Sequence, residues 1–247
     1  MLGQFQSALA STLAPALPGQ DRCSSARRPL VLAALVVLCS FGAAAAAAAA
    51  GGGSVAAAPS EDGWELLERD DAPGEAYELW ARLPAGSKWR AFRLTGDVDV
   101  PPAVAVEVAM DVAADVSRAA RGETRRLLLR TPDVIVTYIR VDFPMVSDRD
   151  VTTRLERTHD TERGEYRMVW REANDEAPPL EDGVVRMQRA RGSWTFQPLA
   201  GERTRVVFES HADLGGSLPA WLINPFMTGT IKSNLVDLRA AIARRGG

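Results

Sequence analysis

The sequence predicts an α+β domain in which a series of antiparallel strands is followed by one long carboxyl-terminal helix. Short apolar runs between residues 76 and 212 are separated by clusters of glycine, proline, aspartate and asparagine, which is the pattern of strands joined by turns. Two stretches, after Pro101 and after Ser217, instead carry apolar residues at helical spacing. An uncharged apolar segment near the amino terminus fits neither pattern.

The first part of the domain is predicted to hold a short helix, a hairpin and a second helix. Residues 64–67 follow an Asp-Gly pair and predict a short opening helix. Residues 76–83 and 89–98 predict two strands, which the turn sequence at 84–87 joins into a hairpin. The paired prolines that begin the stretch 101–116 fit only at the start of a helix, so we expect a helix there.

The remaining residues up to 212 predict strands. In the last of them, Val206 and Phe208 share one face while Val207 and Glu209 share the other. One face is therefore apolar enough to line either a core or a cavity. The predicted strands are 125–130, 133–141, 151–158, 165–171, 184–197 and 204–212.

The carboxyl-terminal segment predicts a helix from Ser217 to Ala243, about 40 Å long if fully helical. Ser217 is a suitable N-cap, and Pro219 lies in the first turn. Pro225 and Gly229 interrupt the segment, and we expect the helix to bend there. The helix is either an ordinary cover for a core or a hinged lid over a cavity. Its apolar stripe consists of Leu218, Leu222, Phe226, Ile231, Leu235, Leu238 and Ile242.

Residues 1–59 are predicted to be a targeting segment and linker, and residues 60–247 the folded domain. Arg27 and Arg28 precede 21 uncharged residues from Leu30 to Ala50, which end in an alanine run. This pattern is typical of a secretory signal peptide, and it also suffices to span a bilayer if it is not cleaved. Lipidation at Cys39 and twin-arginine export are weaker alternatives. We expect an extracytoplasmic domain, periplasmic or secreted, or one anchored by residues 30–50.

The charge balance of the domain disfavours nucleic acid as a partner. After residue 59 the chain has 31 acidic and 26 basic residues, whereas phosphate binding along a nucleic acid needs a clustered basic surface. This stretch is long enough for one sizeable core. Arginine outnumbers lysine 27 to 2 in the whole chain, which favours a GC-rich, bacterial genome.

The domain carries none of the common catalytic or metal-binding motifs. Both cysteines, Cys23 and Cys39, lie in the targeting segment, so the domain has no thiol for a disulfide, a zinc site or a nucleophile. His159 and His211 are too far apart in sequence for a helical metal pair. Neither a nucleophile elbow nor a dinucleotide-binding loop is present. We therefore expect no catalytic residues, no metal and no cofactor.

Three motifs, in this order and at these spacings, resemble the START family of StAR-related lipid transfer domains, part of the helix-grip or SRPBCC superfamily. They are residues 143–150 (FPMVSDRD), 192–198 (GSWTFQP) and 213–224 (DLGGSLPAWLIN). The resemblance covers about Glu61 to Arg245. It implies a curved antiparallel sheet wrapped around the carboxyl-terminal helix, with an apolar ligand in an internal cavity between them.

The resemblance also implies that one buried charged or polar group orients a lipid head. Arg154 is our first candidate, and Arg140 with Tyr138 on the preceding strand are the others; a charge in such a place must be paired. Asp148-Arg149-Asp150 is expected to serve mainly as a turn or a salt bridge. Met145 and Val151 depart from the aromatic residues common in the family. The complete set of candidate ligand-binding residues is Tyr138, Arg140, Arg154, Trp194, Phe208, Trp221 and Phe226.

The function that we expect is binding, and possible transfer, of a lipid or other hydrophobic small molecule by a monomer that contacts membranes transiently. No chemistry is needed for this function. A cyclase or aromatase type of enzyme from the same superfamily is the first alternative, but an export signal argues against it because polyketide assembly is cytoplasmic. A ligand-free envelope scaffold is the second alternative, and it predicts a filled core and an exposed apolar patch.

Overall fold

The computed structural model of the chain describes residues 62–143, 146–216, 218 and 220–246, and all of them belong to one compact unit. The predicted targeting segment and the predicted N-cap Ser217 lie outside the described residues. None of the helices that the described residues form is both long and apolar enough to cross a membrane.

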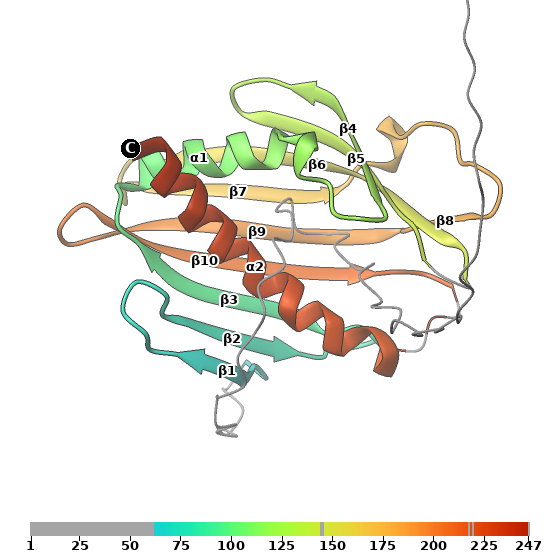
Figure 1. The fold of residues 1–247 in the computed structure, drawn as a ribbon, viewed down its shortest axis with the longest axis horizontal. Coiled ribbons are helices and arrows are strands. Elements are labelled where there is room, and N and C mark those ends of the chain that lie inside the picture. The colour runs from blue at the N-terminus through green and yellow to red at the C-terminus, as the bar shows by residue number, and fades with distance from the viewer. Residues whose placement is uncertain (1–61, 144–145, 217, 219, 247) are drawn as a thin grey trace, which may run out of the picture. The chain divides into compact units, whose positions relative to one another are not determined.

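One sheet and two helices make up this unit (Figure 1). The helices are α1 (Pro102–Ala114) and α2 (Ala220–Gly246), with two short 3-10 turns, η1 (Val116–Arg118) and η2 (Asn174–Glu176). The strands are β1 (Glu65–Asp70), β2 (Tyr77–Arg82), β3 (Ala91–Val98), β4 (Glu123–Arg130), β5 (Val134–Val141), β6 (Asp148–Asp160), β7 (Glu165–Glu172), β8 (Val184–Arg186), β9 (Arg189–Leu199) and β10 (Arg203–Asp213).

The sheet runs in the order β1-β2-β3-β10-β9-β7-β6-β5-β4, and every neighbouring pair in this order is antiparallel. The pairing of β3 with β10 joins the amino-terminal hairpins to the rest of the sheet. β8 pairs in parallel with the first residues of β6, whereas β7 pairs with the later part of β6.

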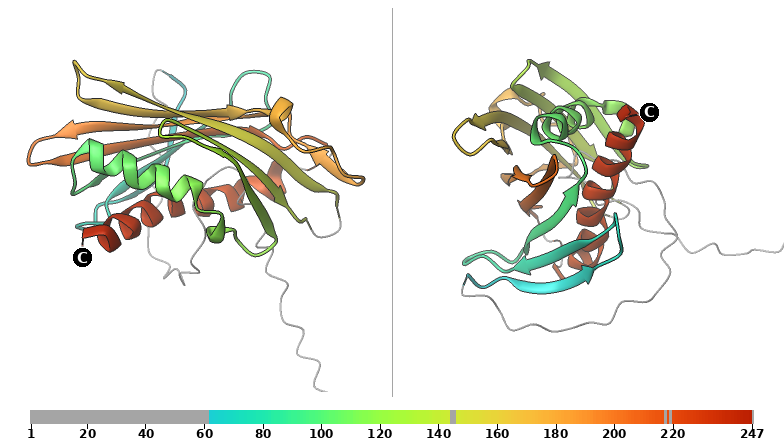
Figure 2. Two further views of the ribbon diagram at one scale, coloured as in Figure 1. Left: turned by 90° about the horizontal axis from the view of Figure 1, so that it is seen from above. Right: turned by 90° about the vertical axis from the view of Figure 1, so that its left-hand side faces the viewer.

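Both helices lie on the same face of the sheet, which we call the inner face (Figure 2). α1 contacts β5, β7, β9 and β10, while α2 contacts β3 and α1. Alternate residues of each strand point to this face, because the side-chain period of a strand is two. Together with the helices they form one core, whose largest fully buried side chains include Phe92, Leu94, Met168, Phe196, Phe208, Ile231 and Leu238.

Most element predictions are confirmed, and two are wrong. The segment predicted to be an opening helix is β1, because pairing with β2 satisfies its backbone hydrogen bonds and six residues are too few for a stable helix. The strand predicted at 184–197 is two strands, β8 and β9, which pair with different partners. The predicted long helix is present as α2, and it is one continuous helix through Pro225 and Gly229.

Candidate ligand-binding site

Aromatic side chains of β9 and β10 lie together at the centre of the inner face. Phe208 stands opposite Trp194 in the strand register, and their ring centroids are 4.6 Å apart with a tilt of 46°. Trp194 also stacks nearly parallel to Phe196 at 6.1 Å. Trp194 and Phe208 are buried, so two of the predicted site residues do share one apolar surface beneath the helices. Contact between a ligand and these rings remains a prediction.

Arg149 brings a charge into this apolar face. It lies on β6 with the same parity as Val151 and Leu155 of the core, and only 3% of its surface is exposed. Its guanidinium lies over the ring of Phe143, with 5.3 Å between Cζ and the ring centroid, and Nη1 donates to the carbonyl oxygen of Ser147. Burial lowers the pKa of Arg149, and the charge of Asp148 opposes this effect.

The guanidinium of Arg149 has hydrogen-bonding capacity left over. Its buried Nε has no hydrogen-bond partner, and no carboxylate of the described residues forms an ion pair with it. Nη2 lies beside Gly216, only 3.0 Å from where a Cβ at that glycine would be. The Nε–Nη2 edge of Arg149 therefore faces the segment that leads into α2.

Further buried polar atoms on this side lack a partner. Among them are Oγ of Ser210 on β10 and Oδ1 of Asn234 on α2. A buried polar group without a hydrogen bond costs about 1–3 kcal/mol, so native proteins rarely keep one without a reason. Ser210 lines a small space with Phe92, Leu214 and Met227. Oγ of Ser210 therefore lies at this space with its hydrogen-bonding capacity unused.

Two small spaces lie between the sheet and the helices. The space beside Ser210 has a volume of about 10 Å³, and a second one, between α1 and the strands β5 to β7, has about the same volume. Each is enough for about one water molecule. A lipid-sized ligand needs a pocket of about 300–1,000 Å³, so neither of these two spaces alone would hold one.

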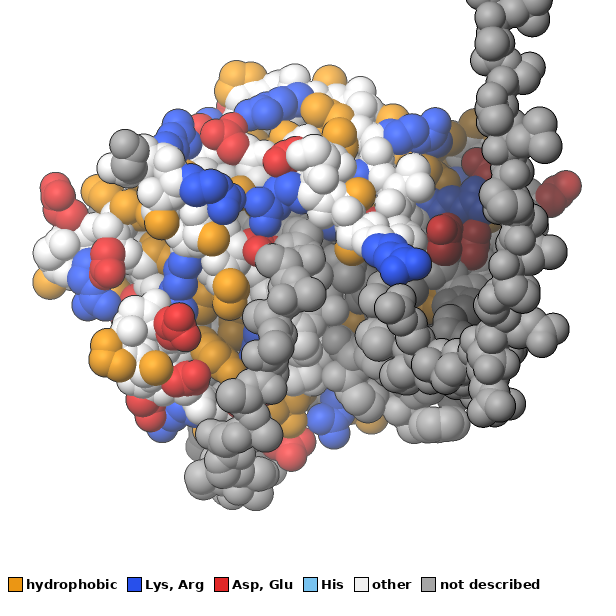
Figure 3. All heavy atoms as spheres, viewed as in Figure 1, with side chains coloured by type: hydrophobic (Ala, Val, Ile, Leu, Met, Phe, Trp, Pro, Cys, Tyr) orange, Lys and Arg blue, Asp and Glu red, His pale blue; other side chains and the backbone are white. Residues whose placement is uncertain are grey.

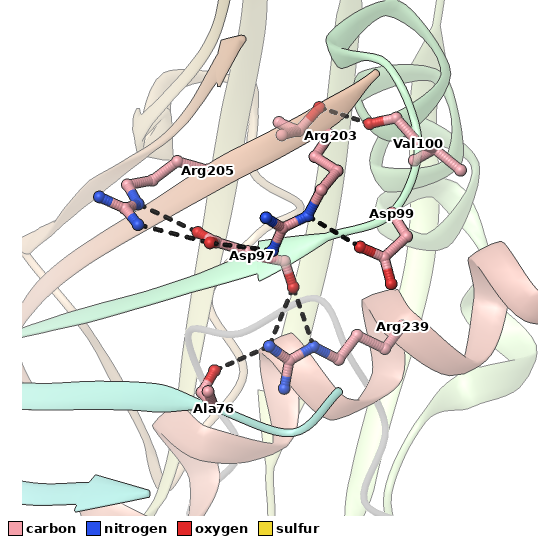
Figure 4. A network of polar contacts seen from close by, with 8 residues as sticks. Ala76, Asp97, Asp99, Val100, Arg203, Arg205 and Arg239 are labelled. Carbon is pink, nitrogen blue, oxygen red and sulfur yellow. Dashed lines mark hydrogen bonds and ion pairs between the residues drawn. The ribbon is translucent and has the colours of Figure 1, made fainter. Parts of the chain in front are cut away.

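The carboxyl-terminal half of α2 is fixed to β2 and β3 (Figure 4). Arg239 donates from Nη2 to the carbonyl oxygens of Ala76 at 2.8 Å and Asp97 at 2.9 Å. Leu235 packs so closely on β3 that a Cβ at Gly96 would lie 2.4 Å from its Cδ2 atom, which only glycine permits. Movement of α2 is therefore expected at its amino-terminal end.

The family to which this fold belongs follows from its sequence. The START domain family profile matches residues 54–245. The chain belongs to the START domain family. The predicted helix-grip fold, a curved antiparallel sheet with a carboxyl-terminal helix against it, is thereby confirmed.

Proteins similar to this START domain are found in two bacteria, and a human protein shares its fold. A Pseudomonas aeruginosa protein, PA1579, is 27% identical over 189 residues, which cover 76% of this chain and 90% of that protein. The crystal structure of a STAR-related lipid transfer protein from Xanthomonas axonopodis is 28% identical, with a TM-score of 0.62 and coverage of 74% of this chain and 99% of that one. Human StAR-related lipid transfer protein 5 shares the fold at 16% identity, with a TM-score of 0.58 and coverage of 76% and 90%.

Three predicted site residues lie on the outer face of the START domain, away from α2, and this corrects the prediction that they face the cavity. Arg154 pairs with Glu156 at 2.7 Å and with Glu176 at 3.1 Å. Arg140 and Tyr138 alternate along β5 with Ile139 and Val141, which belong to the core. Because neighbouring residues of a strand point to opposite faces, the core positions force these three side chains outward.

The segment from η2 to β8 covers this part of the outer face. Arg186 binds Asp150 through two hydrogen bonds, at 2.6 and 3.1 Å, and Asp150 is almost completely buried. Burial raises the pKa of Tyr138, and the charge and hydrogen bond of Asp150 raise it further. Arg140 pairs with Asp148 at 2.7 Å and also with Glu181. Asp148 and Asp150 thus have the salt-bridging role expected for their motif.

Arg149 is the residue of this motif that sequence reasoning missed. Arg149 shares one face of β6 with the apolar residues Val151 and Leu155, and this pattern could have shown that its side chain points into the core. Trp221 and Phe226 lie in α2, but their side chains are outside the described part of the chain. Within that described part, no three histidine or carboxylate side chains are grouped so that they could hold a metal ion.

Proposed function

We propose that this START domain binds a lipid or other hydrophobic small molecule with an acidic head group, between the inner face of the sheet and α2, and carries it outside the cytoplasm. The observation that carries the proposal is Arg149, a buried guanidinium with an unused donor edge at the end of an apolar surface. The Nε–Nη2 edge presents two parallel N–H donors, which is the geometry that binds a carboxylate or a phosphate in bidentate fashion.

The affinity comes mainly from apolar contact. Each Å² of ligand surface removed from water contributes about 25 cal/mol, and Trp194 with Phe208 provides part of the apolar surface. A few polar groups then fix the orientation of the ligand. Arg149 holds the acidic head, and its own burial is less costly once a counter-charge is present. Membership of the START family and likeness to a lipid transfer protein support this assignment.

Uptake requires the segment before α2 to move. Gly215 and Gly216 have positive φ angles of 66° and 61°, and they connect β10 to α2 directly beside Arg149. Their freedom lets the amino-terminal end of α2 swing while Arg239 holds the other end. The ligand then enters next to its own polar anchor.

A transfer assay tests this proposal. Donor vesicles carry a fluorescent fatty acid with a quencher, acceptor vesicles carry neither, and catalytic amounts of the protein are added. We expect fluorescence to rise at a rate proportional to protein concentration. A fluorescent sterol, which has no acidic head, serves as the matched probe and should be transferred more slowly. Equal rates with and without protein would contradict transfer, and equal rates for both probes would contradict the role of Arg149.

A further inference from the structure

A groove of about 350 Å³ crosses the outer face of the sheet, on the side opposite α1 and α2. Its floor is formed by β3, β10, β9 and β7, and Ser193 of β9 is a buried residue of that floor. We call it the arginine groove. Besides Trp64 and His211, the charged residues of its lining are Arg82, Arg167, Arg171, Arg191 and Glu209.

The arginine groove has an excess of positive charge in an acidic domain. Four exposed arginines line it, and none of the four forms an ion pair with any residue that the structure describes. Glu209 is the single carboxylate in the lining, and Arg93 already binds it at 2.6 Å. On the α2 side, by contrast, Figure 3 shows acidic and basic side chains intermixed.

Four arginines elsewhere on the outer face are paired, whereas Arg126 lies over the ring of Tyr138 without an ion pair to a described residue. Arg140, Arg154, Arg203 and Arg205 each bind at least one carboxylate. The domain therefore has enough acidic side chains to neutralise outer-face arginines, and those of the groove are left unneutralised.

Trp64 organises one wall of the groove. Trp64 is almost completely buried, and the guanidinium groups of Arg82 and Arg93 lie over its ring, with Cζ at 4.5 and 4.3 Å from the ring centroid. Stacking restricts the long Arg82 side chain before any ligand arrives, which lowers the entropy lost on binding. On the other side, Nη1 of Arg171 donates to the carbonyl oxygen of Glu172 at 3.0 Å and is held in the same way.

His211 also lines the groove, and the pKa of its imidazole is lowered there. Burial lowers its pKa, and the charge of Arg191 lowers it further. Ser87 contacts its Nε2 at 3.1 Å. The lowered pKa favours the neutral imidazole, so His211 contributes a polar contact to the lining and not a positive charge.

We propose that the arginine groove is a second ligand site, which binds a phosphate group. Guanidinium groups bind phosphate oxygens in bidentate fashion, and several arginines around one pocket of this size match a dianionic group better than a single carboxylate. The phosphate belongs either to a soluble phosphorylated molecule or to the head group of an anionic phospholipid. The site lies on the other face from the proposed lipid site and acts independently of it.

Matched double variants of the complete chain test this site. Arg167→Ala/Arg191→Ala removes two groove arginines, and Arg121→Ala/Arg163→Ala removes the same charge at exposed positions outside the groove. One arm measures binding of inorganic pyrophosphate by calorimetry. The other measures co-sedimentation with phosphatidylcholine vesicles that contain about one third phosphatidylglycerol, with pure phosphatidylcholine as reference.

We expect the groove variant to bind at least one probe about 30-fold more weakly than the control variant, which corresponds to about 1 kcal/mol for each arginine near an anionic surface. If the groove variant binds pyrophosphate more weakly, the phosphate belongs to a soluble molecule. If only its binding to anionic vesicles is weaker, the phosphate belongs to a phospholipid head group. Equal binding by the two variants in both arms would overturn the site, as would binding of polyglutamate in place of both probes.

Folding and the carrier function are checked separately. If the double variant is unfolded by circular dichroism, Arg191→Gln alone should still weaken binding about fivefold; binding unchanged by it would overturn the site. Uptake of the fluorescent fatty acid should be the same in the groove variant and in the control. The two proposals can therefore fail separately: absence of fatty-acid uptake would not affect the test of the groove, and absence of phosphate binding would not affect the test of the carrier function.

Discussion

Arg149 is held on the inner face at a free-energy cost. A guanidinium that loses its water needs a counter-charge or a full set of hydrogen bonds, and Arg149 has the carbonyl oxygen of Ser147 and the ring of Phe143. If its purpose is structural, removing it should weaken the fold. If its purpose is to bind a ligand head, removing it should weaken binding while the fold remains stable.

The first prediction separates these two roles with Arg149→Met, which keeps an unbranched, flexible apolar side chain and removes the charge. We expect the free energy of unfolding of the ligand-free protein to stay the same or to rise by about 1–3 kcal/mol, since a buried charge without an ion pair is replaced by an apolar group. Affinity for oleate, measured by displacement of a fluorescent fatty acid, should fall at least tenfold.

Arg154→Met is the matched control on the same strand. Its side chain points to the outer face and pairs with Glu156 and Glu176, so oleate affinity should not change. If both variants reduce oleate affinity equally, or if Arg149→Met loses more than about 3 kcal/mol of stability, Arg149 is a structural residue and the proposed head-group site is wrong.

The sequence pattern identifies these residues as candidates for the site, but it determines only in part which face of the sheet each side chain points to. On β6, the apolar residues Val151 and Leu155 mark the inner parity, so Arg149 inside and Arg154 outside could have been deduced. On β5 this was not possible from pattern alone, because Val134 and Val136 are apolar on the outer parity as well. The cover provided by η2 and β8 makes that outer face partly buried, and it depends on pairings between segments distant in sequence.

At the scale of elements, α2 is a helix with one anchored end. Arg239 and Leu235 fix its carboxyl-terminal half to β2 and β3. Lys232 reaches β1, where Nζ donates to Glu68 at 2.8 and 2.9 Å. The contact between Lys232 and Glu68 requires residues Glu65–Asp70 to form the strand β1. The sequence pattern instead predicts a short helix at residues 64–67. Local propensity could not show that pairing with β2 would take over, because that pairing comes from the tertiary fold.

The second prediction concerns Gly229, which is exposed and has open space where a Cβ would be. Gly229→Ala should stabilise α2 by up to about 1 kcal/mol, because alanine has the higher helix propensity. If flexibility at this position lets the amino-terminal end of α2 swing, ligand exchange should slow while equilibrium affinity changes little. Stopped-flow uptake and release of a fluorescent fatty acid measure this. Unchanged rates in a variant at least as stable as the parent would exclude a hinge at Gly229.

The third prediction concerns the link between α2 and β1 in acid. Burial raises the pKa of Glu68, but hydrogen bonds from Lys232 and Tyr77 and the charge of Lys232 lower it below its ordinary value of 4.5. Since the folded-state pKa is the lower one, the carboxylate stabilises the fold above about pH 4.5, and this stability is lost as the pH falls through the folded-state pKa.

Glu68→Gln should therefore reduce stability at pH 7 and make the loss of stability between pH 5 and 3 shallower than in the parent. Urea unfolding at a series of pH values measures the difference, with the exposed Glu162→Gln as control. Parallel pH profiles for the parent and Glu68→Gln would show that this ion pair does not link the helix to the sheet.

At the scale of the whole molecule, the location of the START domain is a prediction that rests on the amino-terminal sequence. Residues 1–59 are predicted to be a signal peptide or anchor with a linker, and extracytoplasmic location is part of the proposed function. The fourth prediction is that residues 1–60, fused to a reporter that is active only outside the cytoplasm, give activity in a bacterial host. Deletion of residues 30–41 should abolish that activity. An inactive, cytoplasmic fusion would remove export from the account.

The central claim is that the inner face binds a hydrophobic ligand with an acidic head, and native mass spectrometry of the purified protein tests it most directly. The spectrum should show one bound lipid per chain, and extraction should identify a carboxylate or phosphate head. Arg149→Met, purified in parallel, should carry less of it. Protein that stays free of ligand after purification, and after incubation with a total lipid extract, would contradict the claim.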